Sequence, residues 1–204
     1  MNKKLTLPQT IIITLFCIMM ILAIFNMPQL GIFSIGVSAL FVVIATLSDR
    51  KRIFLSIAMV SLGLVLFIKP IYTFDICLTF IIPGIILGMI TKNVLNHREA
   101  NKYNPIFMGT IAFIIGLIAN YLISKYLFNI NILEEFTSVM KTQLSTQISA
   151  IQESVSSLAS VSNITEESIR QTVLNIMPLI LFSRSIMLSI LTYFLAIYTL
   201  KKIR

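Results

Sequence analysis

The chain has few of the residues that build catalytic and metal sites. Among its 204 residues are one histidine, two cysteines, eight acidic residues and no tryptophan. Cys17 and Cys77 lie in different apolar stretches, without CxxC spacing or a partner histidine, so we interpret them as free thiols. His97 lies in a basic loop, and the sequence contains no HExxH motif, P-loop or clustered carboxylates. We therefore expect no enzyme activity, no metal site and no cofactor.

Charged residues are also scarce. They make up 12% of the chain, and hydrophobic residues make up 57%, against roughly 25% and 45–50% in soluble domains. A water-soluble domain of this size cannot cover its surface with so few charges. The composition excludes a soluble enzyme and a disordered chain, and it predicts an integral membrane protein whose first partner is the lipid bilayer.

Six apolar stretches are long enough to cross a bilayer, since a hydrocarbon core of about 30 Å needs a helix of about 20 mostly apolar residues. The first continues into Asn26-Met27-Pro28-Gln29 without a small-residue cleavage site, so we interpret it as a retained span and not a signal peptide. The predicted fold is all-α, a bundle of six transmembrane helices in one polytopic domain over residues 1–204. The predicted spans cover residues 8–27, 30–48, 53–69, 71–91, 105–127 and 175–200.

The distribution of basic residues predicts the orientation. If the N-terminus is cytoplasmic, 11 of the 16 basic residues and two acidic residues fall in cytoplasmic segments, a net charge of +9. The external segments hold four basic and five acidic residues, a net charge of −1. The positive-inside rule therefore places both termini in the cytoplasm. Because the positive charge is spread along one membrane face, we expect no nucleic-acid partner.

The longest polar segment, residues 130–173, separates the fifth and sixth predicted spans. Apolar residues recur every three or four positions from Leu133 to Val161, which predicts an extracytoplasmic amphipathic helix with a narrow apolar stripe. The stripe could lie on the outer leaflet, pack over the outer ends of the spans, or pair with a second copy in a homo-oligomer. Asn163 and Glu166 resemble a capping box that starts a further helix leading into the last span.

Two charged residues fall inside predicted spans, where charges are costly and mark functional sites by default. Asp75 lies in the fourth span and Arg184 in the sixth, so a pair between the two spans is geometrically possible. Asn120 in the fifth span and Ser183 beside Arg184 would complete a polar pocket. Three interpretations stay open: a structural ion pair, outward snorkelling of the charges without a pair, and a substrate or ion site.

Glycine spacing predicts close helix packing in the fourth and fifth spans. Gly84 and Gly88 form a GxxxG motif in the fourth span, and Gly109 and Gly116 lie in the fifth. Pro178 predicts a kink or a helix start near the last span.

The order of these features resembles the YybS-like family of predicted bacterial membrane proteins, a domain of unknown function. The resemblance runs over about residues 70–204. It rests on the fourth-span segment Phe80–Asn93, the basic loop, the glycine-bearing fifth span, the amphipathic segment and a last span that ends in Lys201-Lys202-Ile203-Arg204. It implies a location in the bacterial cytoplasmic membrane.

The layout is also similar to that of the substrate-binding subunits of energy-coupling-factor transporters. This similarity implies a small-molecule-binding subunit that lacks its own ATPase and docks to a separate ATP-driven module. The alternative is a non-catalytic scaffold or assembly protein that recruits another membrane protein through its amphipathic helix. A polar cavity that reaches Asp75, Asn120 and Arg184 would favour the first function. A solidly packed bundle with an exposed stripe at 133–161 would favour the second.

Overall fold

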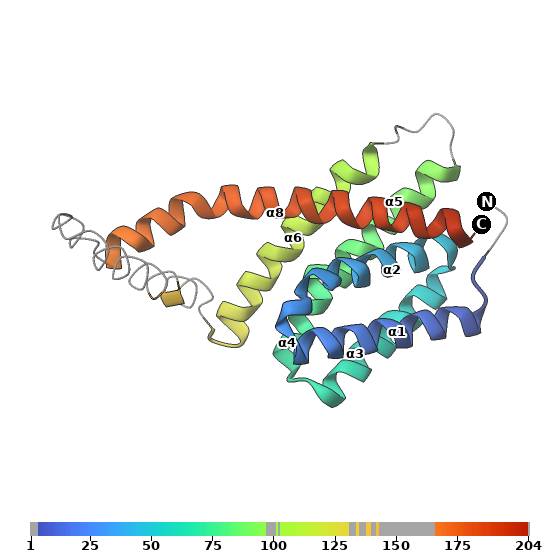
Figure 1. Cartoon of the computed structure of the whole chain (residues 1–204), viewed down its shortest axis with the longest axis horizontal. Helices are drawn as coiled ribbons and strands as arrows, with labels where there is room; N and C mark the ends of the chain where they lie inside the picture. Colours follow the sequence, from blue (N-terminus) through green and yellow to red (C-terminus); the bar gives the residue numbers. More distant parts are fainter. Residues whose placement is uncertain are drawn as a thin grey trace, which may run out of the picture. The chain divides into compact units, whose positions relative to one another are not determined.

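A computed structural model of the chain describes residues 4–96, 101, 103–130, 134, 138, 139, 142 and 166–203. Within these ranges the chain is helical and contains no strand, which confirms the all-α prediction for the described residues (Figure 1). The elements are α1 (Leu7–Asn26), the 3-10 helix η1 (Pro28–Phe33), α2 (Ser34–Leu47), α3 (Arg50–Phe67), α4 (Pro70–Ile76), the π-helical turn η2 (Cys77–Ile81), α5 (Ile82–Asn96), α6 (Asn104–Leu127) and α8 (Glu166–Ile203).

The chain divides into two compact units. The first comprises Met1–Asn120 and Phe182–Arg204, and the second comprises Tyr121–Leu181. In the second unit, α6 ends shortly before Asn129, whose backbone lies in the left-handed region (φ 55°) that often terminates helices, and the Ile130 N–H donates to the Ser124 carbonyl at 2.9 Å. α8 begins at Glu166, earlier than the predicted span, and continues through Pro178. Most of residues 130–173 lie outside the described residues, so the amphipathic helix stays a prediction.

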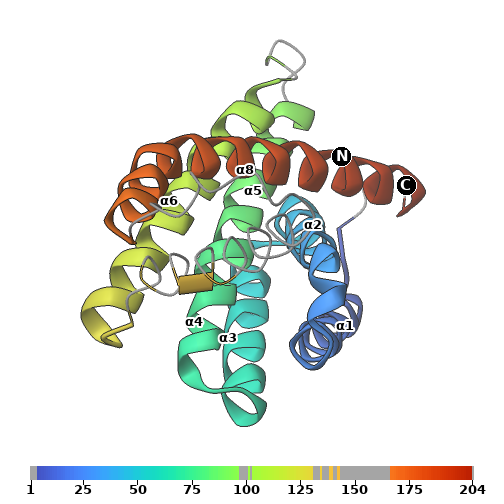
Figure 2. The same ribbon diagram turned by 60° about the vertical axis from the view of Figure 1, so that its left-hand side comes forward.

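Contacts within the first unit define the directions of its helices. Leu5 N–H donates to the Leu47 carbonyl at 3.1 Å, so the start of α1 lies beside the end of α2 and the two helices are antiparallel. α4, η2 and α5 form one rod that follows α3 after a short turn (Figure 2). Three hydrogen bonds set this rod parallel to α2: Ser38 Oγ to the Phe80 carbonyl (3.0 Å), Thr46 Oγ1 to the Gly88 carbonyl (3.1 Å) and Lys92 Nζ to the Ser48 carbonyl (2.9 Å).

Basic side chains from three segments meet at one end of this unit, around the turn between α2 and α3. Lys4 forms a salt bridge with Asp49 at 3.2 Å, Arg52 donates to the Leu5 carbonyl, and Lys92 donates to the Ser48 carbonyl. The opposite end is aromatic, and the rings of Phe25 and Tyr72 lie 5.4 Å apart between centroids. The two ends of the first unit therefore differ in charge and in chemistry.

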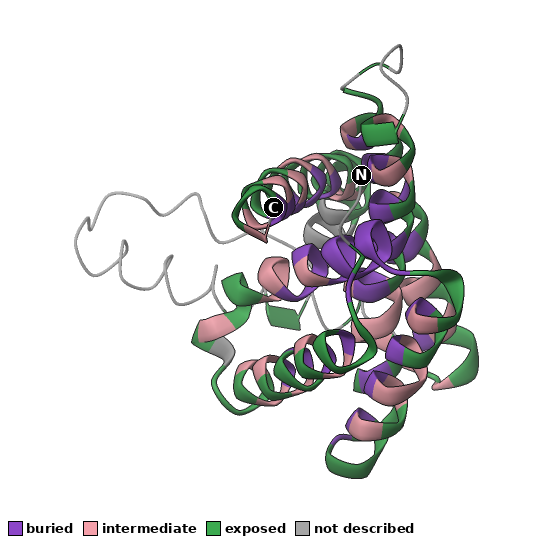
Figure 3. Cartoon of the chain, turned by 90° about the vertical axis from the view of Figure 1, so that its right-hand side faces the viewer, coloured by how far each residue is buried: buried purple, intermediate pink, exposed green. Residues whose placement is uncertain are grey.

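α2 is the most deeply buried helix of the first unit. Every residue from Phe41 to Leu47 is buried, and Figure 3 shows buried residues around this helix while α1 and α3 expose one side. A helix that is apolar on all sides belongs in a core or in a membrane. Two apolar clusters form around α2, one with α1, α3 and α5 and the other with Leu87, Ala196 and Leu200.

The outer faces of the helices are apolar as well. Ile12 on α1 is 65% exposed, Phe54 on α3 is 74% exposed and Leu66 on α3 is 79% exposed. The buried positions of α3 are Ile53, Ser56, Val60 and Leu64, which follow one helical face. Exposing so many apolar side chains to water is unfavourable, whereas exposing them to lipid is favourable.

Within the part of the chain that the structure describes, five helices are long and apolar enough to cross a membrane: Leu7–Asn26, Gln29–Leu47, Pro70–Asn96, Asn104–Leu127 and Leu174–Ile203. The predicted third span corresponds to α3, whose first turn holds Arg50, Lys51 and Arg52. After these charges only residues 53–67 remain, about 22 Å of helix at 1.5 Å per residue. This is shorter than a hydrocarbon core of about 30 Å, so the six-span count stays a prediction.

Candidate functional site

Asp75 lies on α4 and receives hydrogen bonds from two other elements. Thr79 Oγ1 in η2 donates to Asp75 Oδ1 at 3.1 Å, and Asn120 Nδ2 on α6 donates to the same oxygen at 2.7 Å. A half-buried carboxylate in an apolar protein needs such donors, because an unpaired charge is costly to remove from water. The structure thus brings together two of the sequence-predicted site residues, Asp75 and Asn120, and adds Thr79.

A π-helical turn follows Asp75 directly. In η2 the Ile82 N–H donates to the Cys77 carbonyl, five residues earlier, instead of the usual four. Pro83 follows this turn, and its ring would clash with the carbonyl four residues before it in a regular α-helix. Within this wider turn, the Phe80 carbonyl accepts a hydrogen bond from Ser38 Oγ on α2. π-turns are rare and often lie at functional sites. Pro83 was the available sequence signal, but it did not predict the π-turn.

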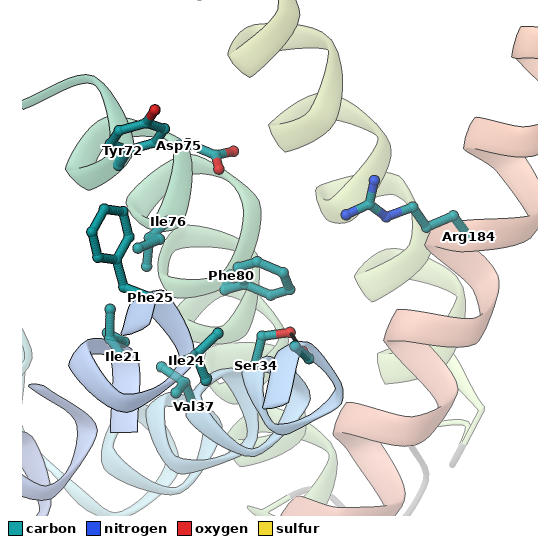
Figure 4. Close-up of a pocket in the computed structure, with 11 residues that line it drawn as sticks. Ile21, Ile24, Phe25, Ser34, Val37, Tyr72, Asp75, Ile76, Phe80 and Arg184 are labelled. Carbon is teal, nitrogen blue, oxygen red and sulfur yellow. Dashed lines mark hydrogen bonds between the residues drawn. The ribbon is translucent and has the colours of Figure 1, made fainter. Parts of the chain in front are cut away.

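A pocket of about 500 Å³ opens beside Asp75 at the aromatic end of the first unit (Figure 4). Its wall is mostly apolar, and its polar side chains are Ser34, Tyr72, Asp75 and Arg184. The apolar lining comes from α1, η1, α2, α4 and η2, and consists of Ile21, Ile24, Phe25, Gly31, Val37, Ile76 and Phe80. A cavity of this size and polarity is typical of small-molecule sites.

Arg184 reaches the same pocket from α8. Figure 4 shows its guanidinium and the Asp75 carboxylate turned toward each other from opposite sides of the pocket. The two groups form no ion pair within 4.0 Å, and the salt bridge recorded among the described residues joins Lys4 to Asp49. Ser183 is exposed and does not line the pocket. Asn120 does not line it either, but it holds the carboxylate that does.

The glycines of the fourth predicted span lie against α2. A Cβ atom on Gly84 would come within 2.7 Å of the Ser38 carbonyl oxygen, and one on Gly88 would come within 2.6 Å of Ala45 Cβ. Both distances are shorter than real Cβ contacts, so only glycine allows the two backbones to approach this closely. The parallel packing of α2 and α5 therefore depends on these two positions.

The glycines of α6 make similar close approaches. A Cβ atom on Gly109 would lie 2.5 Å from Ser189 Oγ on α8, and one on Gly116 would overlap the Leu78 carbonyl oxygen of η2. Ser189 Oγ also donates to the Ile106 carbonyl at 2.7 Å, which ties α8 to α6. These contacts fix the positions of α6, which carries Asn120, and of α8, which carries Arg184.

Comparison with protein-family models matches residues 14–204 to a family described as predicted membrane protein and designated DUF2232. The chain belongs to this family. The matched residues of this DUF2232 protein include every residue that lines the pocket. No curated protein and no solved structure matches the chain.

Membership in a membrane-protein family gives a physical reason for the exposed apolar faces of this DUF2232 protein. Exposed apolar side chains such as Ile12, Phe54 and Leu66 are more stable in contact with lipid than in contact with water. The same setting makes Asp75 and Arg184 unusual, because each charge in an apolar medium needs a partner. Both residues line the same pocket, so a molecule bound in it could contact both charges.

Proposed function

We propose that this DUF2232 protein is a YybS-like small-molecule-binding subunit of the bacterial cytoplasmic membrane, similar to a transporter subunit and without an ATPase of its own. The observation that carries the proposal is the pocket of about 500 Å³ that reaches Asp75 and Arg184. Small-molecule sites have volumes of about 300–1,000 Å³ and combine an apolar wall with a few polar groups. The pocket has both properties.

The position of the pocket supports a role at the outer face of the membrane. It lies at the end of the first unit opposite Lys4, Arg52 and Lys92. If the basic end faces the cytoplasm, as the positive-inside rule favours, the pocket opens toward the extracytoplasmic side. Because the sequence has no P-loop, energy for release of the ligand would come from a separate ATP-driven partner. We expect the subunit itself to perform no covalent chemistry.

Gly31 allows the pocket to be filled without disturbing the bundle. It lines the pocket, and a Cβ atom built on it has no neighbour within 4 Å. We expect the new ring of Gly31→Phe to occupy part of the cavity, because Gly31 lines the pocket and the space around its Cβ position is open. The control is Ala23→Phe, which adds the same ring to an exposed position on α1 that does not line the pocket.

The experiment purifies tagged protein from native membranes under mild conditions and analyses the bound small molecules and proteins by mass spectrometry. We expect a small molecule and an ATPase module to copurify with the wild type and with Ala23→Phe. Gly31→Phe should lose the small molecule. A wild-type preparation with neither a small molecule nor an ATPase module would refute the proposal and would favour a scaffold role, which depends on residues 133–161.

A further inference from the structure

We propose that the pocket binds a zwitterion: a small molecule with one ammonium group and one carboxylate or phosphate group on an apolar body. This inference rests on the proposed function and specifies the ligand of the same site. Asp75 would bind the ammonium group, and Arg184 would bind the anionic group.

Asp75 has one carboxylate oxygen positioned by the protein and one left for a ligand. Thr79 and Asn120 both donate to Oδ1, at 3.1 and 2.7 Å. Among the described residues none donates to Oδ2. An ionised carboxylate has about four acceptor positions on its two oxygens, so Oδ2 can accept hydrogen bonds from an ammonium group. The two fixed bonds orient the carboxylate before a ligand arrives.

Arg184 presents the complementary group. No residue in the described part of the chain forms a hydrogen bond or an ion pair within 4.0 Å with its guanidinium. The guanidinium has five N–H donors in a planar arrangement that matches both oxygens of a carboxylate or a phosphate. Figure 4 shows that it extends from α8 toward the pocket.

The charge of the pocket selects a zwitterion over a ligand with a single charge. Asp75 and Arg184 line one cavity but do not pair directly, and together they have no net charge. A ligand with one charge would satisfy one of the two groups and leave the other unpaired in an apolar setting, which is costly. A zwitterion pairs both groups and leaves the occupied pocket neutral.

The rest of the lining fits an apolar body. Phe25, Ile76 and Phe80 lie along the cavity between α1 and the η2 turn, and Tyr72 packs its ring against Phe25. An aromatic or branched aliphatic ligand side chain would contact these residues. Two sources carry the required chemistry: a free apolar amino acid, or the headgroup of an ethanolamine phospholipid, which has an ammonium group and a phosphate.

The test measures equilibrium binding to the purified full-length protein in detergent micelles. The first probes are phenylalanine, N-acetylphenylalanine, which lacks the ammonium charge, and phenylalaninamide, which lacks the carboxylate. Hydrogen bonds to charged groups are worth about 10- to 100-fold in affinity. We expect phenylalanine to bind about 10- to 100-fold more tightly than either derivative. A short-chain phosphatidylethanolamine that binds more tightly than phenylalanine, while the matching phosphatidylglycerol does not bind, assigns the zwitterion to a lipid.

Two variants assign the charges. Asp75→Asn should lower phenylalanine affinity to that of N-acetylphenylalanine and should leave the affinity for N-acetylphenylalanine unchanged. Arg184→Gln should lower phenylalanine affinity to that of phenylalaninamide. Ser183→Ala is the matched control, because Ser183 is exposed beside Arg184 but does not line the pocket. Arg184 is itself exposed, so Arg184→Gln should fold even if Asp75→Asn does not.

The inference is overturned if the wild type binds no zwitterion, soluble or lipid. It is also overturned if a single-charge analogue binds as tightly as the zwitterion that the wild type binds, or if the folded variants bind that zwitterion like the wild type. Failure of the proposed function is a separate result. The proposed function fails if the native-membrane preparation contains neither a small molecule nor an ATPase module, or if Gly31→Phe retains the small molecule. Neither measurement depends on the identity of the ligand.

Discussion

A methyl group added at Gly88 tests the closest contact between α2 and α5. In Gly88→Ala the new Cβ would lie 2.6 Å from Ala45 Cβ and 2.7 Å from the Val42 carbonyl oxygen. Neither atom is at the end of a flexible side chain, so rotation of a side chain cannot relieve the overlap. The two helices would have to separate, and the Thr46 hydroxyl would move away from the Gly88 carbonyl, which now accepts its hydrogen bond at 3.1 Å.

The expected loss of unfolding free energy combines three contributions. Overpacking a well-packed core costs up to about 3 kcal/mol. A lost hydrogen bond between membrane helices costs about 0.6 kcal/mol. Alanine is more favourable than glycine in a helix interior by about 1 kcal/mol, and this gain offsets part of the cost. We therefore expect Gly88→Ala to lower the unfolding free energy by up to about 2.6 kcal/mol.

The assay is equilibrium unfolding of the purified protein in mixed micelles with increasing denaturing detergent. Gly31→Ala is the control, because a Cβ at Gly31 meets nothing within 4 Å, and it should stay within about 0.5 kcal/mol of the wild type. Adding Ala45→Gly to Gly88→Ala should recover part of the loss, since it removes one of the two overlapping atoms. If Gly88→Ala and Gly31→Ala unfold together, close backbone packing does not stabilise this helix pair.

Two further predictions concern the basic end of the first unit and the topology. The hydrogen bond and charge of Lys4 hold the pKa of Asp49 below its ordinary value of 3.8. The ion pair therefore stabilises the folded protein fully above pH 3.8, and this stabilisation is lost as the pH falls through the lower pKa that Asp49 has in the folded state. Lys4→Met should raise the pKa of Asp49 in an NMR titration, and an unchanged pKa would show that Lys4 does not act on it. Alkaline phosphatase, which is active only outside the cytoplasm, should be active when fused after Asn129 and inactive when fused after Lys51. Any other pattern contradicts the predicted orientation.

Helix positions were largely predictable from the sequence, because apolar composition is a local property. The first predicted span, residues 8–27, and α1, Leu7–Asn26, differ by one residue at each end. Thr6 caps this helix by accepting a hydrogen bond from the Gln9 N–H, while the Gln9 side chain accepts one from the Thr6 N–H. Boundaries were less accurate where a helix continues beyond its apolar stretch, as α5 does to Asn96 and α8 does from Glu166.

The candidate site was only partly predictable. The cost of charge in an apolar medium was enough to select Asp75 and Arg184. It did not identify Thr79 or Tyr72, because a hydroxyl group in a membrane helix is common and can bond to its own backbone, as Thr91 does to the Leu87 carbonyl. The π-turn was also missed, because Pro83 excludes a regular α-helical hydrogen bond but does not by itself determine whether the helix kinks, ends or widens into a π-turn.

The amino-acid sequence by itself determined that this is an all-α membrane protein, where most of its helices lie, and which charged residues need a partner inside the apolar region. Only the tertiary structure decided which residues meet. Asp75 and Asn120 are 45 positions apart and lie 2.7 Å apart between Oδ1 and Nδ2, whereas Asp75 and Arg184 face each other across a pocket without pairing. The reason is geometric. Helices that are apolar on every side have little pattern to set their rotation or their neighbours, so close contacts at Gly84, Gly88, Gly109 and Gly116 set them instead.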